Sequence, residues 1–147
     1  MSSGRVVTRV SSTVRRPGIA AAKVKRLVEA TLRAERIDDA MISVTFVGRT
    51  AMSRLNSKYL HHSGPTDVIS FGMGRETNAV PAIGDIYICP DIARRNAGAN
   101  AVSEAEELAR LVVHGALHVA GHDHPRGESR MQSKMWKRQE RILASVD

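Results

Sequence analysis

The chain has little cysteine and no long apolar run, and each shortage excludes a class of protein. Cys89 is the only cysteine in 147 residues, so no internal disulfide can form, which fits a reducing compartment. It lies in the apolar run I-Y-I-C-P and is predicted to be buried, with a reactive thiol as the minor alternative. No apolar stretch approaches the ~20 residues of a membrane span, and the first residues lack the apolar region of a secretory signal. We therefore expect a cytoplasmic protein with no membrane partner.

Aromatic residues are also scarce, at 3% of the chain. A sheet surface that stacks several RNA bases needs more of them, so an RNA-recognition-motif type of module is excluded. The net charge is +7, which favours a polyanionic partner, with nucleic acid first. The alternative is that this charge serves solubility alone. Any RNA contact should run mainly from Lys and Arg to phosphates.

A length of 147 residues predicts a single domain, 1–147, large enough to fold around one core. Period-two stretches predict strands at 5–10, 42–47, 68–71 and 83–89, the first two parallel and the last two paired as an irregular hairpin. The predicted fold class is α+β, a small mixed sheet of about four strands with helices packed on it.

Capping residues and helical spacing predict the helices. Pro17 suits a helix start, and the apolar stripe of that helix comprises Val24, Leu27, Val28, Thr31 and Leu32. A second helix is predicted to be capped by Thr50 and to bury Met52, Leu55 and Tyr59. A short helix is expected at 92–97. The capping box at Ser103 and Glu106 opens the next helix, and a last helix is expected at 128–144 with Met131, Met135 and Ile142 inward.

Three histidines in the run H-G-A-L-H-V-A-G-H-D-H carry most of the functional information. His114 and His118 are four residues apart, which places both imidazoles on one helix face. Gly121 lets the chain reverse, so that His124 can return to the same point. Three imidazoles with a fourth position left for water are typical of a catalytic zinc site, so we predict one zinc ion per chain, with unrelated histidines as the alternative. Imidazole also suits copper, iron and nickel.

The spacing H-x-x-x-H-x-x-G-x-x-H is similar to that of the metzincin proteases, which carry a glutamate after the first histidine as general base. Here that residue is Gly115, which cannot take a proton. The sequence therefore predicts a metzincin-like three-histidine metal site without the protease base. His122 lies in the turn between two ligands and is either a neighbour of the site or exposed. Asp123 either orients a ligand or caps the turn.

The chain resembles the YbeY family of bacterial endoribonucleases. The run from His114 to His124 is similar to the family signature H-G-x-L-H-L-x-G-x-D-H, with Val119 in place of a leucine. The segments T-D-V-I-S-F (66–71) and G-D-I (84–86) and the pair L-N (55–56) also match, and the resemblance covers roughly residues 42–143. It implies one α+β domain, zinc held by the three histidines, and single-strand-specific endoribonuclease activity. The implied roles are maturation of the small-subunit ribosomal RNA 3′ end and ribosome quality control, with ribosomal RNA and ribosome-associated proteins as partners.

One residue departs from the family pattern. After L-N-x-x-Y the family usually has an arginine that is thought to contact RNA, and this chain has Leu60. The guanidinium fork that would hold a phosphate is therefore absent at that position. Lys58, His61 and His62 are the nearby candidates for RNA contact.

The expected reaction is metal-assisted cleavage of RNA, by attack of water or of the ribose 2′-hydroxyl. No carboxylate is assigned as general base, and Asp67 and Asp85 are interpreted as structural rather than catalytic. Two alternatives stay open. One is a non-catalytic, zinc-containing RNA- or ribosome-binding factor. The other is a zinc peptidase, against which Gly115 argues.

Overall fold

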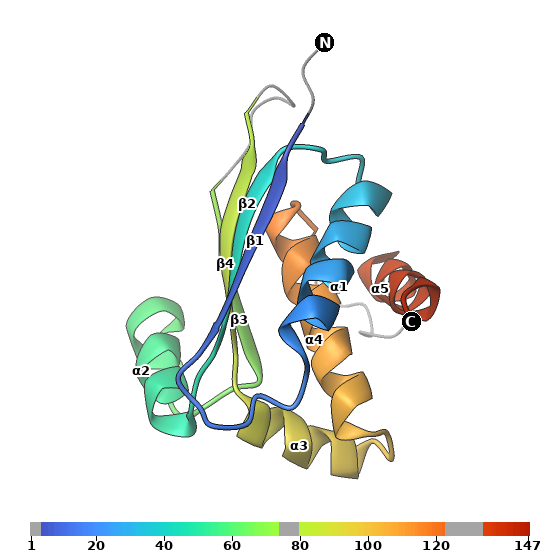
Figure 1. Ribbon diagram of the computed structural model, residues 1–147. Helices are drawn as coiled ribbons and strands as arrows, with labels where there is room; N and C mark the ends of the chain where they lie inside the picture. Colours follow the sequence, from blue (N-terminus) through green and yellow to red (C-terminus); the bar gives the residue numbers. More distant parts are fainter. Residues whose placement is uncertain (1–3, 74–79, 123–133) are drawn as a thin grey trace.

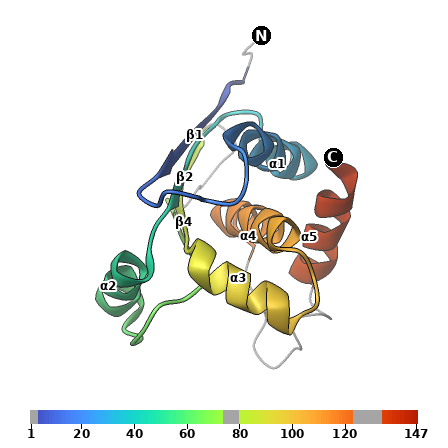
Figure 2. The ribbon, with the colours of Figure 1, turned by 60° about the horizontal axis from the view of Figure 1, so that its bottom comes forward.

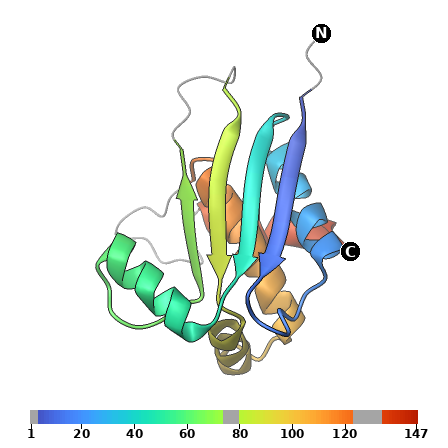
Figure 3. The ribbon, with the colours of Figure 1, turned by 60° about the vertical axis from the view of Figure 1, so that its left-hand side comes forward.

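The computed structural model describes residues 4–73, 80–122 and 134–147, and its centre is a mixed four-stranded sheet (Figure 1). The strands are β1 (Val6–Ser12), β2 (Ala40–Phe46), β3 (Val68–Gly72) and β4 (Ala82–Ile88). Their order is β1-β2-β4-β3, as Figure 3 shows, and β3 is the edge strand that runs opposite to the others. The predicted α+β class, the parallel pairing of the first two strands and the pairing of the last two are confirmed.

The helices lie in unequal layers on the two faces of the sheet (Figures 1 and 2). One face is covered by α1 (Ala21–Ala34), α4 (Glu104–Val119) and α5 (Lys134–Ser145). The helix α2 (Arg49–Leu60) lies on the opposite side, and α3 (Pro90–Ala99) lies across one end of the sheet. Helix α4 contacts both the sheet and α5, so it forms the centre of the thicker layer.

The larger core forms between the sheet and the three-helix layer. The five predicted stripe residues of α1 are all buried, and β2 alternates with Ile42, Val44 and Phe46 inward. Alternation with period two in the strand and about 3.6 in the helix gives two apolar surfaces that match. Cys89 is buried at the end of β4, as predicted.

Two glycines let α4 lie unusually close to the sheet. A Cβ atom on Gly115 would lie 2.7 Å from Cγ2 of Ile86, and one on Gly84 would lie 2.6 Å from both methyl groups of Val119. Real Cβ atoms do not approach other carbons so closely, so a larger residue at either position would push the helix from the sheet. The absence of glutamate after His114 therefore has a packing reason: that position faces β4.

Several predicted helix details are wrong. The first helix begins at Ala21, because Pro17 precedes a turn in which Gly18 has φ of +88°. Thr50 does not cap α2, since Gly48 is the N-cap and its carbonyl accepts the first helical hydrogen bond from Met52. Tyr59 is 50% exposed instead of buried.

The capping box that opens α4 is confirmed on one side, because the Ser103 hydroxyl accepts from the Glu106 backbone N–H at 3.0 Å. The predicted last helix lies partly outside the described residues, and so does Met131; α5 is described from Lys134, with Met135 and Ile142 buried as predicted. Among the described helices, none is both long enough and apolar enough to cross a membrane.

Candidate functional site

The first two predicted ligands, His114 and His118, lie together on one face of α4. Their Nε2 atoms are 3.1 Å apart and their ring centroids 4.7 Å apart. His114 is 7% exposed, and His118 is partly buried one turn later. The i, i+4 spacing therefore brings both imidazoles to one point, as predicted.

A glutamine from the last helix fixes the ring of His114. The Nδ1 atom of His114 lies 2.7 Å from Oε1 of Gln139, which is fully buried. The Nε2 amide nitrogen of Gln139 donates to the carboxylate of Glu140 at 3.1 Å. Gln139 was not among the residues predicted from the sequence, although it lies four residues after Met135 and three before Ile142, on the inward stripe of α5. A polar residue on such a stripe needs a hydrogen-bond partner, and that signal could have found it.

An ion pair lies next to this glutamine. Arg110, one turn before His114 on α4, donates from Nε and Nη2 to the two carboxylate oxygens of Glu140, both at 2.9 Å. The hydrogen bonds to Glu140 raise the pKa of Arg110 above its ordinary value. Arg110 also lies within 4 Å of Glu106 and Glu107. A fork-to-fork pair of this kind has a fixed geometry, so it holds Glu140 in one place.

Helix α4 ends directly after the histidine pair in a Schellman turn. Gly121 has φ of +108°, its N–H donates to the carbonyl of His118, and the N–H of His122 donates to the carbonyl of Leu117. This is the glycine-dependent reversal that the sequence predicted. His124 and Asp123, which follow, lie outside the described residues.

His122 contacts the end of helix α1. Its Nε2 atom pairs with the nearly buried carboxylate of Glu35, which also accepts from Nε of Arg138. Arg138 in addition donates from Nη2 to the carbonyl of Ala34 at 2.8 Å. These contacts tie the chain after α4 to both α1 and α5.

The described part of the site fits a zinc ion. Two nitrogen ligands on a tetrahedral zinc with Zn–N bonds of 2.0–2.1 Å lie roughly 3.3 Å apart, close to the 3.1 Å between the two Nε2 atoms. An acceptor on Nδ1 of a ligand histidine is the usual support for such a ring. Among the described residues, no group of three His, Cys, Asp or Glu side chains could hold a metal. The third predicted ligand, His124, lies outside these residues.

The predicted RNA-contact residues lie together at the end of α2. Lys58 is exposed, with Nζ 5.2 Å from the ring centre of Tyr59. His61 and His62 are exposed, and His61 ends the helix in a left-handed conformation. The loop that carries them is tied to the helix by Asn56, whose amide donates to the carbonyl of Gly64 at 2.9 Å. Leu60, which stands where the resemblance implies an arginine, is 43% exposed.

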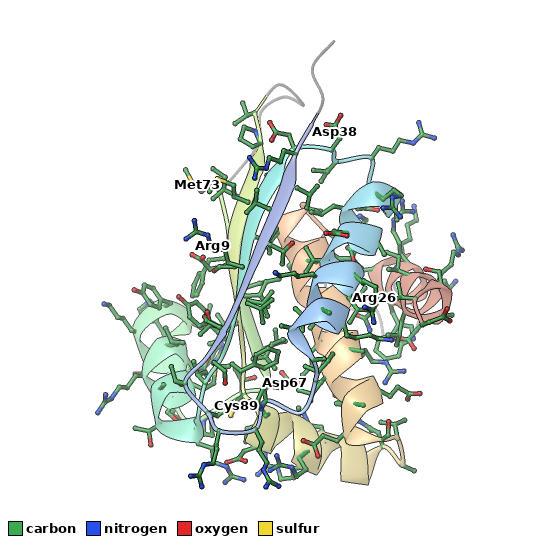
Figure 4. All side chains as sticks on the ribbon, viewed as in Figure 1. Arg9, Arg26, Asp38, Asp67, Met73 and Cys89 are labelled. Atoms are coloured by element: carbon green, nitrogen blue, oxygen red, sulfur yellow. The ribbon has the colours of Figure 1, made fainter. Side chains whose placement is uncertain are left out.

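The two aspartates of the strand motifs make structural contacts. Asp67 accepts from the N–H of Val68 at 2.7 Å and from Asn96 at 3.3 Å, at the end of the sheet near Cys89 (Figure 4). Asp85 accepts from the hydroxyl of Ser43 at 2.5 Å on the neighbouring strand. Both carboxylates therefore support the sheet, which agrees with the structural interpretation of these residues.

Comparison with known proteins agrees with these observations. The family model for endoribonuclease YbeY matches residues 11–147. An "Endoribonuclease YbeY" of Geobacter metallireducens is 34% identical over 141 residues, which cover 94% of each chain. One of Frankia alni is 38% identical over 118 residues, covering 74% of this chain and 64% of the relative, so this chain spans less than two thirds of that relative's length.

A solved structure is also similar. The solution structure of a Thermotoga maritima protein superposes with a TM-score of 0.64 and 26% sequence identity, covering 95% of this chain and 89% of the other. The family model and the relatives together cover nearly the whole sequence, including the histidine run. The chain therefore belongs to the YbeY endoribonuclease family.

Proposed function

We propose that the protein is a zinc-dependent, single-strand-specific endoribonuclease of the cytoplasm. We propose that it acts in maturation of the small-subunit ribosomal RNA 3′ end and in ribosome quality control, with ribosomal RNA and ribosome-associated proteins as partners. The observation that carries the proposal is the pair of Nε2 atoms of His114 and His118, 3.1 Å apart, with Nδ1 of His114 already occupied by Gln139. The names of the relatives support the reaction class.

In this proposal His114, His118 and His124 hold one zinc ion. A zinc ion held there would act as a Lewis acid, which would make hydroxide available near neutral pH and would polarise a phosphoryl oxygen. Helix α4 packs directly against β4 and α5, and we propose that this packing holds the buried ring of His114 in one orientation. Asp123 and His122 are proposed to orient the third ligand and its turn. Lys58, His61 and His62 are proposed to contact phosphates, in place of the arginine that Leu60 replaces.

The test is cleavage of a single-stranded ribosomal RNA fragment by the purified protein. His118→Ala and Glu29→Ala are prepared in the same way, the latter as a control that changes an exposed residue of α1. We expect cleavage by the parent and by Glu29→Ala, and none by His118→Ala. Equal cleavage by all three proteins would show a contaminating nuclease and contradict the mechanism. The same fragment annealed to its complement should stay intact.

A second candidate is a non-catalytic RNA- or ribosome-binding factor in which zinc is structural. The observation in its favour is Leu60, an exposed apolar side chain where the family usually has an arginine. Such a factor would bind the RNA fragment and zinc and leave the RNA intact. Restoring the usual residue with Leu60→Arg separates the two: a gain of cleavage from an inactive parent would favour an enzyme that has lost its RNA contact.

A zinc peptidase is the least supported of the three candidate functions. The general base of the metzincins would stand at Gly115, where even a Cβ atom meets Ile86. A glutamate there would need the helix to move from the sheet. We therefore expect a panel of unstructured peptides to remain uncut under conditions in which RNA is cleaved.

A further inference from the structure

We propose that Gln139, held by Glu140 and Arg110, is a positioning residue that fixes the tautomer of His114 and thereby sets the affinity of the site for zinc. The inferred ligand is a zinc ion at the proposed site, so this inference rests on the proposed function for its consequence. Its structural part concerns only described residues of α4 and α5.

Glu140 fixes the orientation of the Gln139 amide. The Nε2 atom of Gln139 lies 3.1 Å from Oε2 of Glu140, and a carboxylate oxygen can only accept. The amide nitrogen therefore faces Glu140 and the amide oxygen faces His114. Arg110 holds Glu140 with two hydrogen bonds of 2.9 Å, so the carboxylate that orients the amide is itself fixed.

The amide oxygen of Gln139 in turn determines the tautomer of His114. Because Oε1 of Gln139 is an acceptor, Nδ1 of His114, 2.7 Å away, must carry a proton. A neutral imidazole with its proton on Nδ1 has its lone pair on Nε2, the atom that faces His118. Only a nitrogen with an available lone pair can bind a metal, so Gln139 selects the form of His114 that binds.

Position 139 carries a neutral amide instead of a carboxylate, and its surroundings explain why. Arg110 already lies within 4 Å of the carboxylates of Glu106, Glu107 and Glu140. A glutamate at position 139 would add a fourth negative charge to this group, and at a side chain that is fully buried. Glutamine supplies the same acceptor without the cost of a buried charge. The neutral residue is therefore the one that suits this environment.

The tautomer can be measured directly in the metal-free protein. Long-range ¹⁵N–¹H NMR distinguishes an imidazole protonated on Nδ1 from one protonated on Nε2. We expect Nδ1–H for His114 in the parent and a shift toward Nε2–H in Gln139→Leu, which keeps a similar shape and removes the acceptor. A proton on Nε2 in the parent, or on Nδ1 in both proteins, would overturn the proposal.

The zinc affinity is measured by competition with a chromophoric chelator on folded protein. Residues that orient a ligand typically change metal affinity about 10- to 100-fold, and we expect a loss in that range for Gln139→Leu. Met135→Ala is the matched control, because it opens a cavity one turn earlier on the same buried stripe and leaves the amide in place. Its affinity should equal that of the parent. An unchanged affinity in Gln139→Leu, or the same loss in Met135→Ala, would contradict a positioning role.

Glu140→Gln keeps the proposal testable if the leucine variant does not fold. This variant retains the Gln139 amide and removes the carboxylate that orients it, so we expect an intermediate loss of zinc affinity. An unchanged affinity would overturn the part assigned to Glu140 and Arg110. The tautomer measurement needs neither zinc nor RNA, so the two proposals can fail separately. A parent protein that does not cleave RNA would contradict the proposed function, whereas the tautomer of His114 would still test the positioning role of Gln139.

Discussion

The two buried sides of helix α4 make different kinds of contact. Toward the sheet, the helix presents Gly115 and Val119 to Ile86 and Gly84, and this apolar contact leaves no room for a Cβ atom at either glycine. Toward α5, it presents Arg110 and His114 to Glu140 and Gln139, and the contact is a chain of hydrogen bonds. The first interface places the helix, and the second orients one imidazole on it.

The apolar contact with the sheet and the hydrogen-bonded contact with α5 therefore lie on two sides of the same sixteen-residue helix. An apolar interface tolerates no added volume, because interiors are packed as densely as crystals. A polar interface tolerates no missing partner, because a buried donor or acceptor left unpaired costs about 1–3 kcal/mol. Substitutions on the two sides should therefore fail in different ways.

The largest effect is expected from Gly115→Glu on the sheet side. The new side chain would overlap Ile86 and bring a charge into the core, so we expect a loss of more than ~4 kcal/mol in the free energy of unfolding. Urea denaturation followed by circular dichroism measures it. Gly98→Ala in α3, where a Cβ would meet nothing within 4 Å, should be neutral or stabilising by up to ~1 kcal/mol. A stable Gly115→Glu would contradict the described approach of α4 to β4.

The next effect is expected from Leu117→Ala, which removes a fully buried side chain next to His118. Deletion of a buried leucine side chain costs about 2–5 kcal/mol. Zinc bound per folded molecule should nevertheless stay at the parent value, because the imidazoles remain in place. Calorimetric titration of the folded variant checks this, and loss of zinc binding at full folding would show that apolar packing, and not the hydrogen bonds alone, holds the imidazoles.

A smaller effect is expected from the ion pairs. Arg110→Met breaks a pair whose arginine side chain is only 15% exposed, and we expect a loss of about 2 kcal/mol, less than for a fully buried pair. Arg94→Met breaks pairs with Asp91 and Glu104 that lie at the surface, and its stability should be close to that of the parent. Equal losses in chemical denaturation would show that the α5 contact of Arg110 is no more than a surface pair.

The smallest effect on the metal-free protein is expected from His118→Ala, because His118 is partly exposed and lies outside the apolar core. We expect a change below ~1 kcal/mol, within the range of substitutions away from the core. The parent should gain about 2.7 kcal/mol at zinc concentrations 100 times the dissociation constant, and His118→Ala much less. Thermal unfolding with and without zinc, reversed by a chelator, measures both, and equal stabilisation of the two proteins would place the metal elsewhere.

The sequence predicted those features that depend on neighbours in the chain. The stripe of α1, the capping hydrogen bond of Ser103, the glycine reversal at Gly121 and the proximity of His114 and His118 all follow from periodicity or local turn chemistry. The sequence also placed Cys89 in the core, because it continues an apolar strand.

Features set by distant contacts were missed or wrong. The insertion of β4 between β2 and β3 depends on pairing across long chain segments. Tyr59 continues the apolar side of α2 but lies near the end of the helix, where its ring contacts Phe71 and stays half exposed. The contact between His114 and Gln139 joins residues 25 positions apart, and only the buried polar position on α5 pointed to it.

The most direct test of the account is to restore zinc to metal-stripped protein while following cleavage of a single-stranded ribosomal RNA fragment. The account predicts no cleavage by the stripped parent, recovery that saturates at one zinc ion per chain, and no recovery in His118→Ala. Cleavage by the stripped parent at an unchanged rate in excess chelator, or full recovery in His118→Ala, would contradict a ribonuclease built on this histidine pair.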